Sequence, residues 1–92
     1  RAFEEVESAL AAEQALARRE EALRKGLADA RAALDQAERR YLAGLTDLLT
    51  LQESQRRLYD IESQILAVVR RRLETRVQLH LALGGGFSWP RG

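Results

Sequence analysis

The chain has 92 residues, a net charge of +1 and no Cys. This length allows one small domain at most. Its 15 Lys and Arg nearly balance its 14 Asp and Glu, which argues against a nucleic-acid binder, because binding to phosphates needs many uncompensated cations. Without Cys there are no disulfides or thiolate metal sites, and no apolar run approaches the ~20 residues with which a helix spans a bilayer.

Much of the apolar content is alanine. Apolar residues make up 46% of the chain and aromatic residues 5%, and 15 of the apolar residues are Ala. Because an alanine side chain buries little area, a self-contained core would be thin. The chain also begins at Arg1 instead of Met, so we interpret it as part of a longer protein.

Residues 1–42 are predicted to form one long helix. The segment has no Pro and one Gly, Gly26, and it is rich in strong helix formers such as Ala, Glu, Arg and Leu. Positions seven residues apart form rows, which is the spacing of a coiled-coil seam. The first row is apolar throughout and the second is polar in its middle: Ala2, Ala9, Leu16, Leu23, Ala30 and Ala37, then Val6, Glu13, Glu20, Leu27, Leu34 and Tyr41.

Residues 48–83 are predicted to form a second long helix, because the segment contains neither Gly nor Pro. Its rows make a stripe wider than a two-stranded seam needs, so we expect this helix to contact more than one neighbour. Two rows are nearly apolar and the third is mixed: Leu51, Leu58, Ile65, Arg72 and Leu79; Tyr59, Leu66, Leu73 and His80; and Leu48, Gln55, Glu62, Val69, Arg76 and Leu83.

Residues 43–47 are predicted to form a tight turn between the helices. Gly44 suits the left-handed conformation that ends a helix, because it has no Cβ to clash. Asp47 is placed to cap the second helix, and its charge favours a helix N-terminus. A connection this short makes the helices antiparallel neighbours. The expected fold is all-α, a coiled-coil hairpin that needs self-association or partner helices to cover its stripes.

Residues 84–92 form a Gly-rich tail. Its Gly84, Gly85 and Gly86 disfavour a helix, and Pro90 prevents one further on. The glycines lack the preceding strand, the following helix and the Lys-Ser/Thr pair of a phosphate-binding loop. We therefore expect the tail to end the second helix and not to bind a nucleotide.

No set of residues predicts catalysis, a metal site or a cofactor. The only His, His80, lacks the partners of a metal site or catalytic triad, and we interpret it as an interface or surface residue. Arg70, Arg71 and Arg72 point in different directions around a helix, and we interpret them as solvated or lying along apolar surface. We expect a protein that is not an enzyme.

Three sequence blocks and the spacing between them resemble outer membrane factors of the TolC/OprM type. The blocks are RAFEEVESALAA at 1–12, AERRYLAGLTDLLTLQESQRRLY at 37–59 and LALGGGF at 81–87, and they extend over almost the whole chain. The resemblance implies a trimeric channel of the Gram-negative outer membrane with an α-barrel in the periplasm. This chain would be the last helical hairpin of that α-barrel, and the channel would act with a periplasmic adaptor and an inner-membrane transporter.

The resemblance also implies roles for two groups of residues. In the family, acidic residues six and nine positions after the tip glycine ring the tunnel mouth, and these positions are Thr50 and Glu53 here. Glu53 keeps the charge, so that three copies would form an acidic constriction, whereas Thr50 departs from the pattern. The alternative for Glu53 is an exposed carboxylate near a helix start. The stretch that would meet adaptor hairpins comprises Tyr41, Ala43, Gly44, Leu45, Thr46 and Asp47.

A second interpretation remains open, a freestanding coiled-coil interaction module such as the helical hairpin of a periplasmic adaptor. Flanking sequence would separate the two. A channel would carry an earlier, similar helical repeat and amphipathic strands, whereas an adaptor would carry a lipoyl-like β domain split around the hairpin. An enzyme is a distant third.

Overall fold

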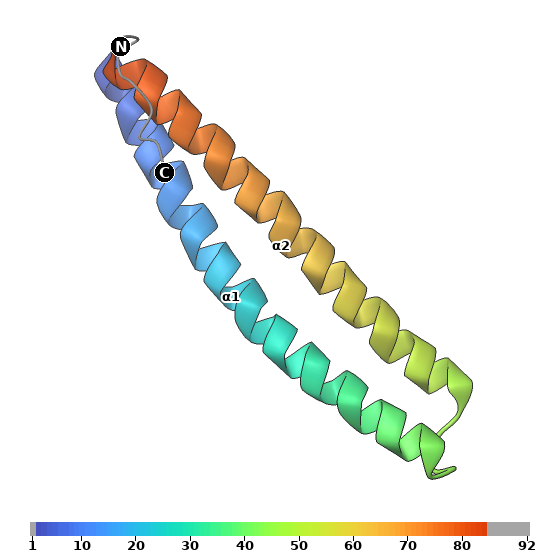
Figure 1. The fold of residues 1–92 in the computed structure, drawn as a ribbon. Helices are drawn as coiled ribbons and strands as arrows, with labels where there is room; N and C mark the ends of the chain where they lie inside the picture. The colour runs from blue at the N-terminus through green and yellow to red at the C-terminus, as the bar shows by residue number, and fades with distance from the viewer. Residues whose placement is uncertain (1, 85–92) are drawn as a thin grey trace, which may run out of the picture.

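The computed structural model describes residues 2–84, which form two long antiparallel helices (Figure 1). Helix α1 spans Ala2–Leu42 and helix α2 spans Leu48–Leu83. No strand occurs in residues 2–84, and the molecule measures 62 × 27 × 16 Å along its principal axes. The all-α hairpin predicted from the sequence is confirmed.

The seam between the helices is narrow and built largely from small side chains. No large side chain in the described part of the chain is fully buried. Most buried positions of α1 come from the row that is apolar throughout, and all but Ala9 lie in the half of α1 nearer the turn. The buried positions are Ala9, Leu27, Ala30 and Ala37 from α1, with Ile65, Val68 and Thr75 from α2.

Small side chains let the helices approach closely near mid-length. A Cβ added to Gly26 would lie 3.9 Å from Ile61 Cδ1, which is an ordinary van der Waals contact.

The one buried polar residue of the seam, Thr75, is hydrogen-bonded within its own helix. Its hydroxyl donates to the Arg71 carbonyl oxygen at 2.9 Å. Over residues 3–84, every buried side-chain nitrogen or oxygen has a hydrogen-bond partner. The thin seam therefore carries no unsatisfied polar group of this kind.

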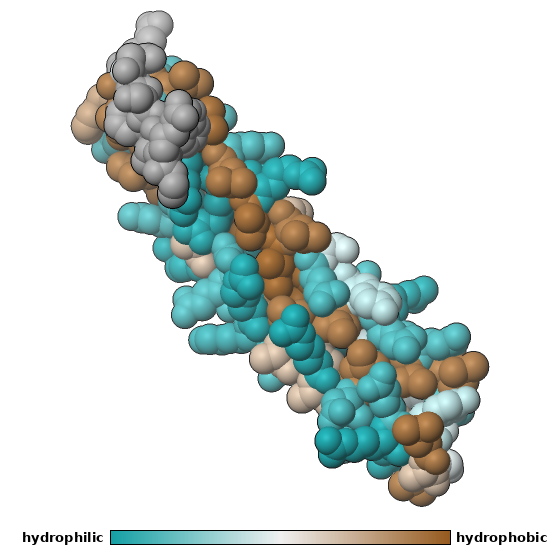
Figure 2. Space-filling model, in the orientation of Figure 1, coloured by the Kyte–Doolittle hydropathy of each residue, from teal (hydrophilic) through white to brown (hydrophobic). Residues whose placement is uncertain are grey.

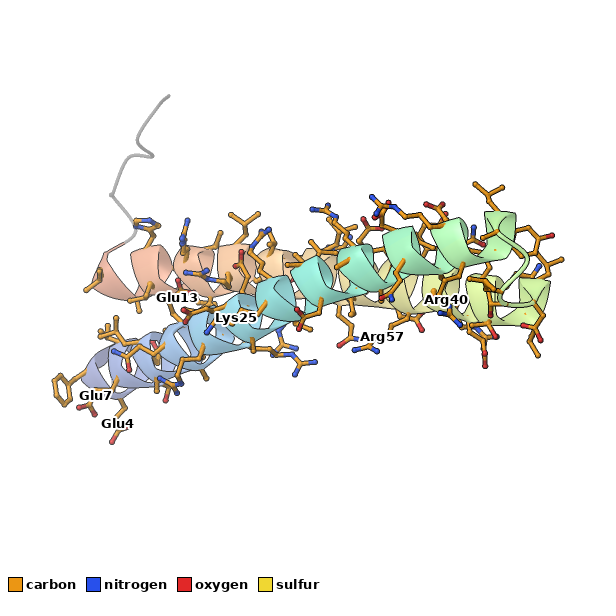
Figure 3. The ribbon with its side chains drawn as sticks, turned by 90° about the horizontal axis from the view of Figure 1, so that it is seen from below. Glu4, Glu7, Glu13, Lys25, Arg40 and Arg57 are labelled. Atoms are coloured by element: carbon orange, nitrogen blue, oxygen red, sulfur yellow. The ribbon has the colours of Figure 1, made fainter. Side chains whose placement is uncertain are left out.

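Glu13 and Glu20, the polar residues in the middle of the second row of α1, contact Arg72, the polar residue in an otherwise apolar row of α2. Arg72 donates to Glu13 through Nη2 at 2.7 Å and to Glu20 through Nη1 at 2.8 Å. We call Glu13, Glu20 and Arg72 the Arg72 cluster. Figure 3 shows Glu13 between the two helices, in the half of the rod away from the turn. At this level an ion-pair layer takes the place of apolar packing.

A second face of α2 is apolar and uncovered. Three residues of the row that begins at Tyr59 are exposed, and one of them, Leu66, keeps 69% of its surface. Figure 2 shows apolar side chains in a band along the rod and at its turn. Within residues 2–84, neither helix combines the length and apolar character that crossing a membrane requires. We define the outer stripe as the exposed residues of this face: Tyr59, Leu66, Leu73, Val77 and Leu81.

Candidate functional site: the hairpin tip

The turn begins where Gly44 ends α1. Gly44 has a φ of 76°, in the left-handed region that favours glycine, and this prediction is confirmed. The Gly44 N–H donates to the Tyr41 carbonyl oxygen at 3.0 Å, and the Leu45 N–H donates to the Arg40 carbonyl oxygen at 2.7 Å. These bonds form a Schellman motif, which satisfies carbonyl groups at a helix end. The Arg40 guanidinium, near the turn in Figure 3, also donates to the Leu45 carbonyl oxygen at 3.4 Å.

Asp47 begins α2 as its N-cap, as predicted. Its backbone is extended, with φ −99° and ψ 171°, and its Oδ1 accepts a hydrogen bond from the Thr50 N–H at 2.9 Å. This hydrogen bond lowers the pKa of the Asp47 carboxyl, because it favours the ionised form. The Asp47 carbonyl oxygen accepts from the Leu51 N–H at 3.3 Å. Hydrogen bonds at both ends therefore hold the connection between the helices in one shape.

The surface of the turn is apolar. Leu42, Leu45, Leu48 and Leu49 surround it and are all exposed, and Leu42 keeps 84% of its surface. We call these four residues the tip patch. Figure 2 shows apolar side chains gathered at this end of the rod. Exposed apolar patches on small proteins mark surfaces that bind other proteins.

The predicted docking residues fall into two kinds. Gly44 and Asp47 shape the backbone, whereas the others present side chains beside the turn: Tyr41, Ala43 and Leu45 are exposed, and Thr46 is half-buried. The predicted docking residues do not include the other leucines of the tip patch. The available signal was that Leu42 and Leu49 stand outside every apolar row of their helices. A leucine that lies at a helix end and outside the contact between the helices is available to bind another protein.

Thr50 and Glu53 are both exposed in the first turns of α2. Thr50 is tied to the turn through the Asp47 cap. A ring of like residues needs several copies of a chain, so one hairpin does not itself form the constriction. Glu53 borders a shallow depression that it shares with Arg56, Arg57, Asp60, Ile61 and Gln64.

An open cleft of about 740 Å³ lies at the other end of the rod, between the start of α1 and the end of α2. Its walls carry the carboxylates of Glu4 and Glu5 beside small residues such as Ala9 and Ala12. No group of three or more His, Asp or Glu in residues 2–84 is placed to hold a metal ion. The cleft offers little to a small ligand, and the tip patch is the better candidate for binding.

The structure corrects the interpretation of one arginine. Arg70 and Arg71 are exposed, but Arg72 is not a solvated side chain. Its side chain keeps 24% exposure and pairs with Glu13 and Glu20 across the seam. The signal was present in the sequence, because polar residues interrupt one row of each helix at levels that an antiparallel turn brings together.

The sequence was also compared with known proteins. The profile of the family described as outer membrane efflux protein matches residues 1–85. A relative from Pseudomonas putida, named pyoverdine export outer membrane protein OpmQ, is 40% identical over 87 residues, covering 95% of this chain and 18% of the relative. A relative of the same name from Pseudomonas aeruginosa is 36% identical over 90 residues, covering 98% of this chain and 19% of the relative. No solved structure gives a significant match.

The match covers both helices and the turn between them, although the chain spans less than a fifth of the length of these relatives. The family consists of transport proteins of the outer membrane, which favours the channel interpretation over an adaptor hairpin. The resemblance carried by the three sequence blocks is confirmed. The chain belongs to the outer membrane efflux protein family.

Proposed function

We propose that this chain is a hairpin in the wall of the periplasmic α-barrel of a trimeric efflux channel, and that its tip docks a periplasmic adaptor. The tip patch carries the docking proposal, because four exposed leucines lie in and beside a turn that hydrogen bonds close at both ends. Membership in the efflux family supports the channel. The adaptor would connect this channel to an inner-membrane transporter.

The outer stripe supports a place in a barrel wall. A helix in a ring of helices packs against neighbours on two sides, so it needs two apolar faces. In α2 one face forms the seam with α1, and the other carries the exposed Tyr59, Leu66 and Leu73. Further helices of the trimer would cover this second face. The same stripe would make these 92 residues, studied alone, associate into a helical oligomer.

We also propose that Thr50 and Glu53 line the channel near its periplasmic mouth. Both are exposed on α2 close to the turn. Three copies of Glu53 around a threefold axis would form an acidic ring that attracts cations. Thr50 would add a neutral ring of hydroxyl groups nearer the tip.

The cargo is proposed from the names of the relatives. Both are named for pyoverdine export, which makes pyoverdine the first cargo to test. A deletion strain that lacks the gene for this chain would be assayed for pyoverdine in the medium, with and without the gene restored. Equal release in both strains would remove this cargo from the proposal.

Photocrosslinking tests the docking proposal. A photoreactive phenylalanine analogue replaces Leu45 or Leu49 in the natural polypeptide in its own membrane, and mass spectrometry identifies the crosslinked protein. The expected product joins the channel to a periplasmic adaptor. The matched control replaces Glu7, which is exposed at the opposite end of the rod (Figure 3). Adaptor crosslinks from Glu7 and none from either leucine would reject the tip assignment without affecting the family membership.

A further inference from the structure

The apolar pattern decides only weakly which face of the first half of α1 meets α2. Alanines lie on all sides of this half: Ala9 is buried, whereas Ala11 and Ala15 are exposed on the opposite side. Alanines bury similar small areas, so rotation of α1 about its axis changes their burial little. Leu16 and Leu23 favour the observed face, but both remain half-exposed there.

Arg72 reaches two levels of α1 from one point of α2. Its Nη2 lies 2.7 Å from Glu13 Oε2, and its Nη1 lies 2.8 Å from Glu20 Oε1. Its Nε also donates to Glu13 Oε1 at 3.2 Å, so the guanidinium makes a forked pair with the two oxygens of Glu13. Glu13 and Glu20 are seven residues apart and therefore share one face of α1.

Neighbouring charges complete the cluster. The side chains of Glu13 and Glu20 keep only 21% and 16% exposure. Arg24 Nε lies 2.7 Å from Glu20 Oε2, and Arg76 Nη2 lies 3.9 Å from Glu13 Oε2. The hydrogen bonds from Arg72 lower the pKa of both glutamates. Both carboxylates are therefore partly withdrawn from water and matched by arginines of the two helices.

Other faces of α1 would leave this cluster incomplete. A rotation by two residue steps, ~200°, would bring Ala11 to the place of Ala9 and carry both carboxylates away from α2. Arg72 would then face Ala15 and Ala22, whose side chains offer no acceptor. A partly buried charge without its partner costs much more than the small change in alanine burial.

We infer that Arg72 is a positioning residue, which selects through Glu13 and Glu20 the face of the first half of α1 that packs on α2. The turn joins the helices at one end of the rod, and the Arg72 cluster sets their rotation in the other half. Partly buried ion pairs can supply such specificity while adding little net stability. The inference does not depend on what the tip binds.

Cysteine pairs can measure the rotation directly, because the 92 residues contain no Cys. Ala9 and Ala82 line the same cleft between the helices, so Ala9→Cys with Ala82→Cys reports the observed face. Ala11→Cys with Ala82→Cys reports the opposite face. Each pair is placed in the natural polypeptide and oxidised, and the disulfide-linked peptides are quantified by mass spectrometry. The first pair should dominate in the otherwise unaltered protein.

The cluster is then removed without leaving an unpaired charge, by combining Glu13→Ala, Glu20→Ala and Arg72→Ala. The ratio of the two crosslinks should fall about tenfold, the scale expected when a partly buried ion-pair layer no longer specifies the packing. Arg72→Lys keeps the charge without the fork and should give an intermediate ratio. An unchanged ratio in the triple variant would overturn the inference.

A control variant separates positioning from general loss of stability. Ile65→Ala removes a buried side chain of the seam without changing any charge, so it should lower the melting temperature and preserve the crosslink ratio. A ratio that collapses equally in Ile65→Ala and in the triple variant would also contradict a special role for Arg72.

Discussion

The Asp47 side chain holds the backbone of Thr50, because its Oδ1 accepts a hydrogen bond from the Thr50 N–H at 2.9 Å. The residue that caps α2 is thereby joined to one of the two proposed channel-lining positions. On the other side of the turn, Gly44 ends α1 in the left-handed conformation. Changes at these two residues are expected to alter the tip before they alter the rest of the rod.

Asp47→Ala should fray the first turn of α2, because it removes the acceptor for the Thr50 N–H. Amide hydrogen exchange at Thr50 should become several-fold faster in the variant. Asp47→Ser keeps an oxygen that can cap the helix, so its exchange should remain near that of the unaltered chain. Equal exchange in the two variants would show that the cap does not hold this turn.

Two glycine substitutions should have opposite effects on stability. Gly44→Ala forces an L side chain into the left-handed region at φ 76° and should cost about 1–2 kcal/mol. Gly26→Ala adds a Cβ in ordinary contact with Ile61 inside a helix and should stabilise by about 0.5–1 kcal/mol. Denaturant unfolding measures both changes. Shifts of the same sign would contradict this assignment of the two glycines.

Acid should destabilise the hairpin through Glu13 and Glu20. The pKa of each lies below its ordinary value of 4.5, chiefly because Arg72 donates hydrogen bonds to the ionised carboxylates. Such a group stabilises the folded state above its unfolded pKa and loses this contribution as the pH falls through the folded pKa. The melting temperature should therefore decline as the pH falls below ~5.

A paired variant isolates this acid effect. Glu13→Gln with Glu20→Gln removes both titrating groups and should flatten the decline of the melting temperature with falling pH. Glu38→Gln, an exposed change on the same helix, serves as the control and should leave the slope as it is. A steep slope in the paired variant would assign the acid sensitivity to other carboxylates.

The outer stripe predicts a melting temperature that rises with protein concentration for the 92 residues alone, because association stabilises the folded state. Leu66→Gln with Leu73→Gln should weaken this dependence, since both side chains are exposed on one face. Arg71→Gln changes an exposed residue outside the stripe and is the matched control. Concentration-independent melting of the unaltered chain would contradict self-association.

Glu53→Gln in the assembled channel should reduce block by divalent cations several-fold, because it neutralises each member of the proposed acidic ring. Single-channel recording in a planar bilayer measures this block. Glu62→Gln, at a half-buried position further from the turn, controls for the general loss of a negative charge from α2. An unchanged record for Glu53→Gln would leave this residue as an ordinary exposed carboxylate.

Local chemistry made much of the hairpin predictable from the sequence. The conformation of Gly44 and the cap at Asp47 depend on groups only a few residues away, and both were predicted correctly. The partners of Arg72 were not predicted, because Glu13 is 59 residues distant in sequence and the pair exists only after the helices align. Leu42 was not recognised as tip surface, because the docking residues were taken from the family resemblance and not from the apolar rows, which leave Leu42 outside the seam.

The apolar surface of the hairpin outside the seam holds more large side chains than the seam itself. In the proposed channel, a copy of the hairpin without neighbours would therefore unfold readily and display leucines to solvent, and proteases and chaperones act on such chains. Assembly of the hairpin into the channel would cover these leucines and would thereby also protect the chain from degradation. The thinness of the seam would thus act as quality control, keeping assembled copies and clearing the rest.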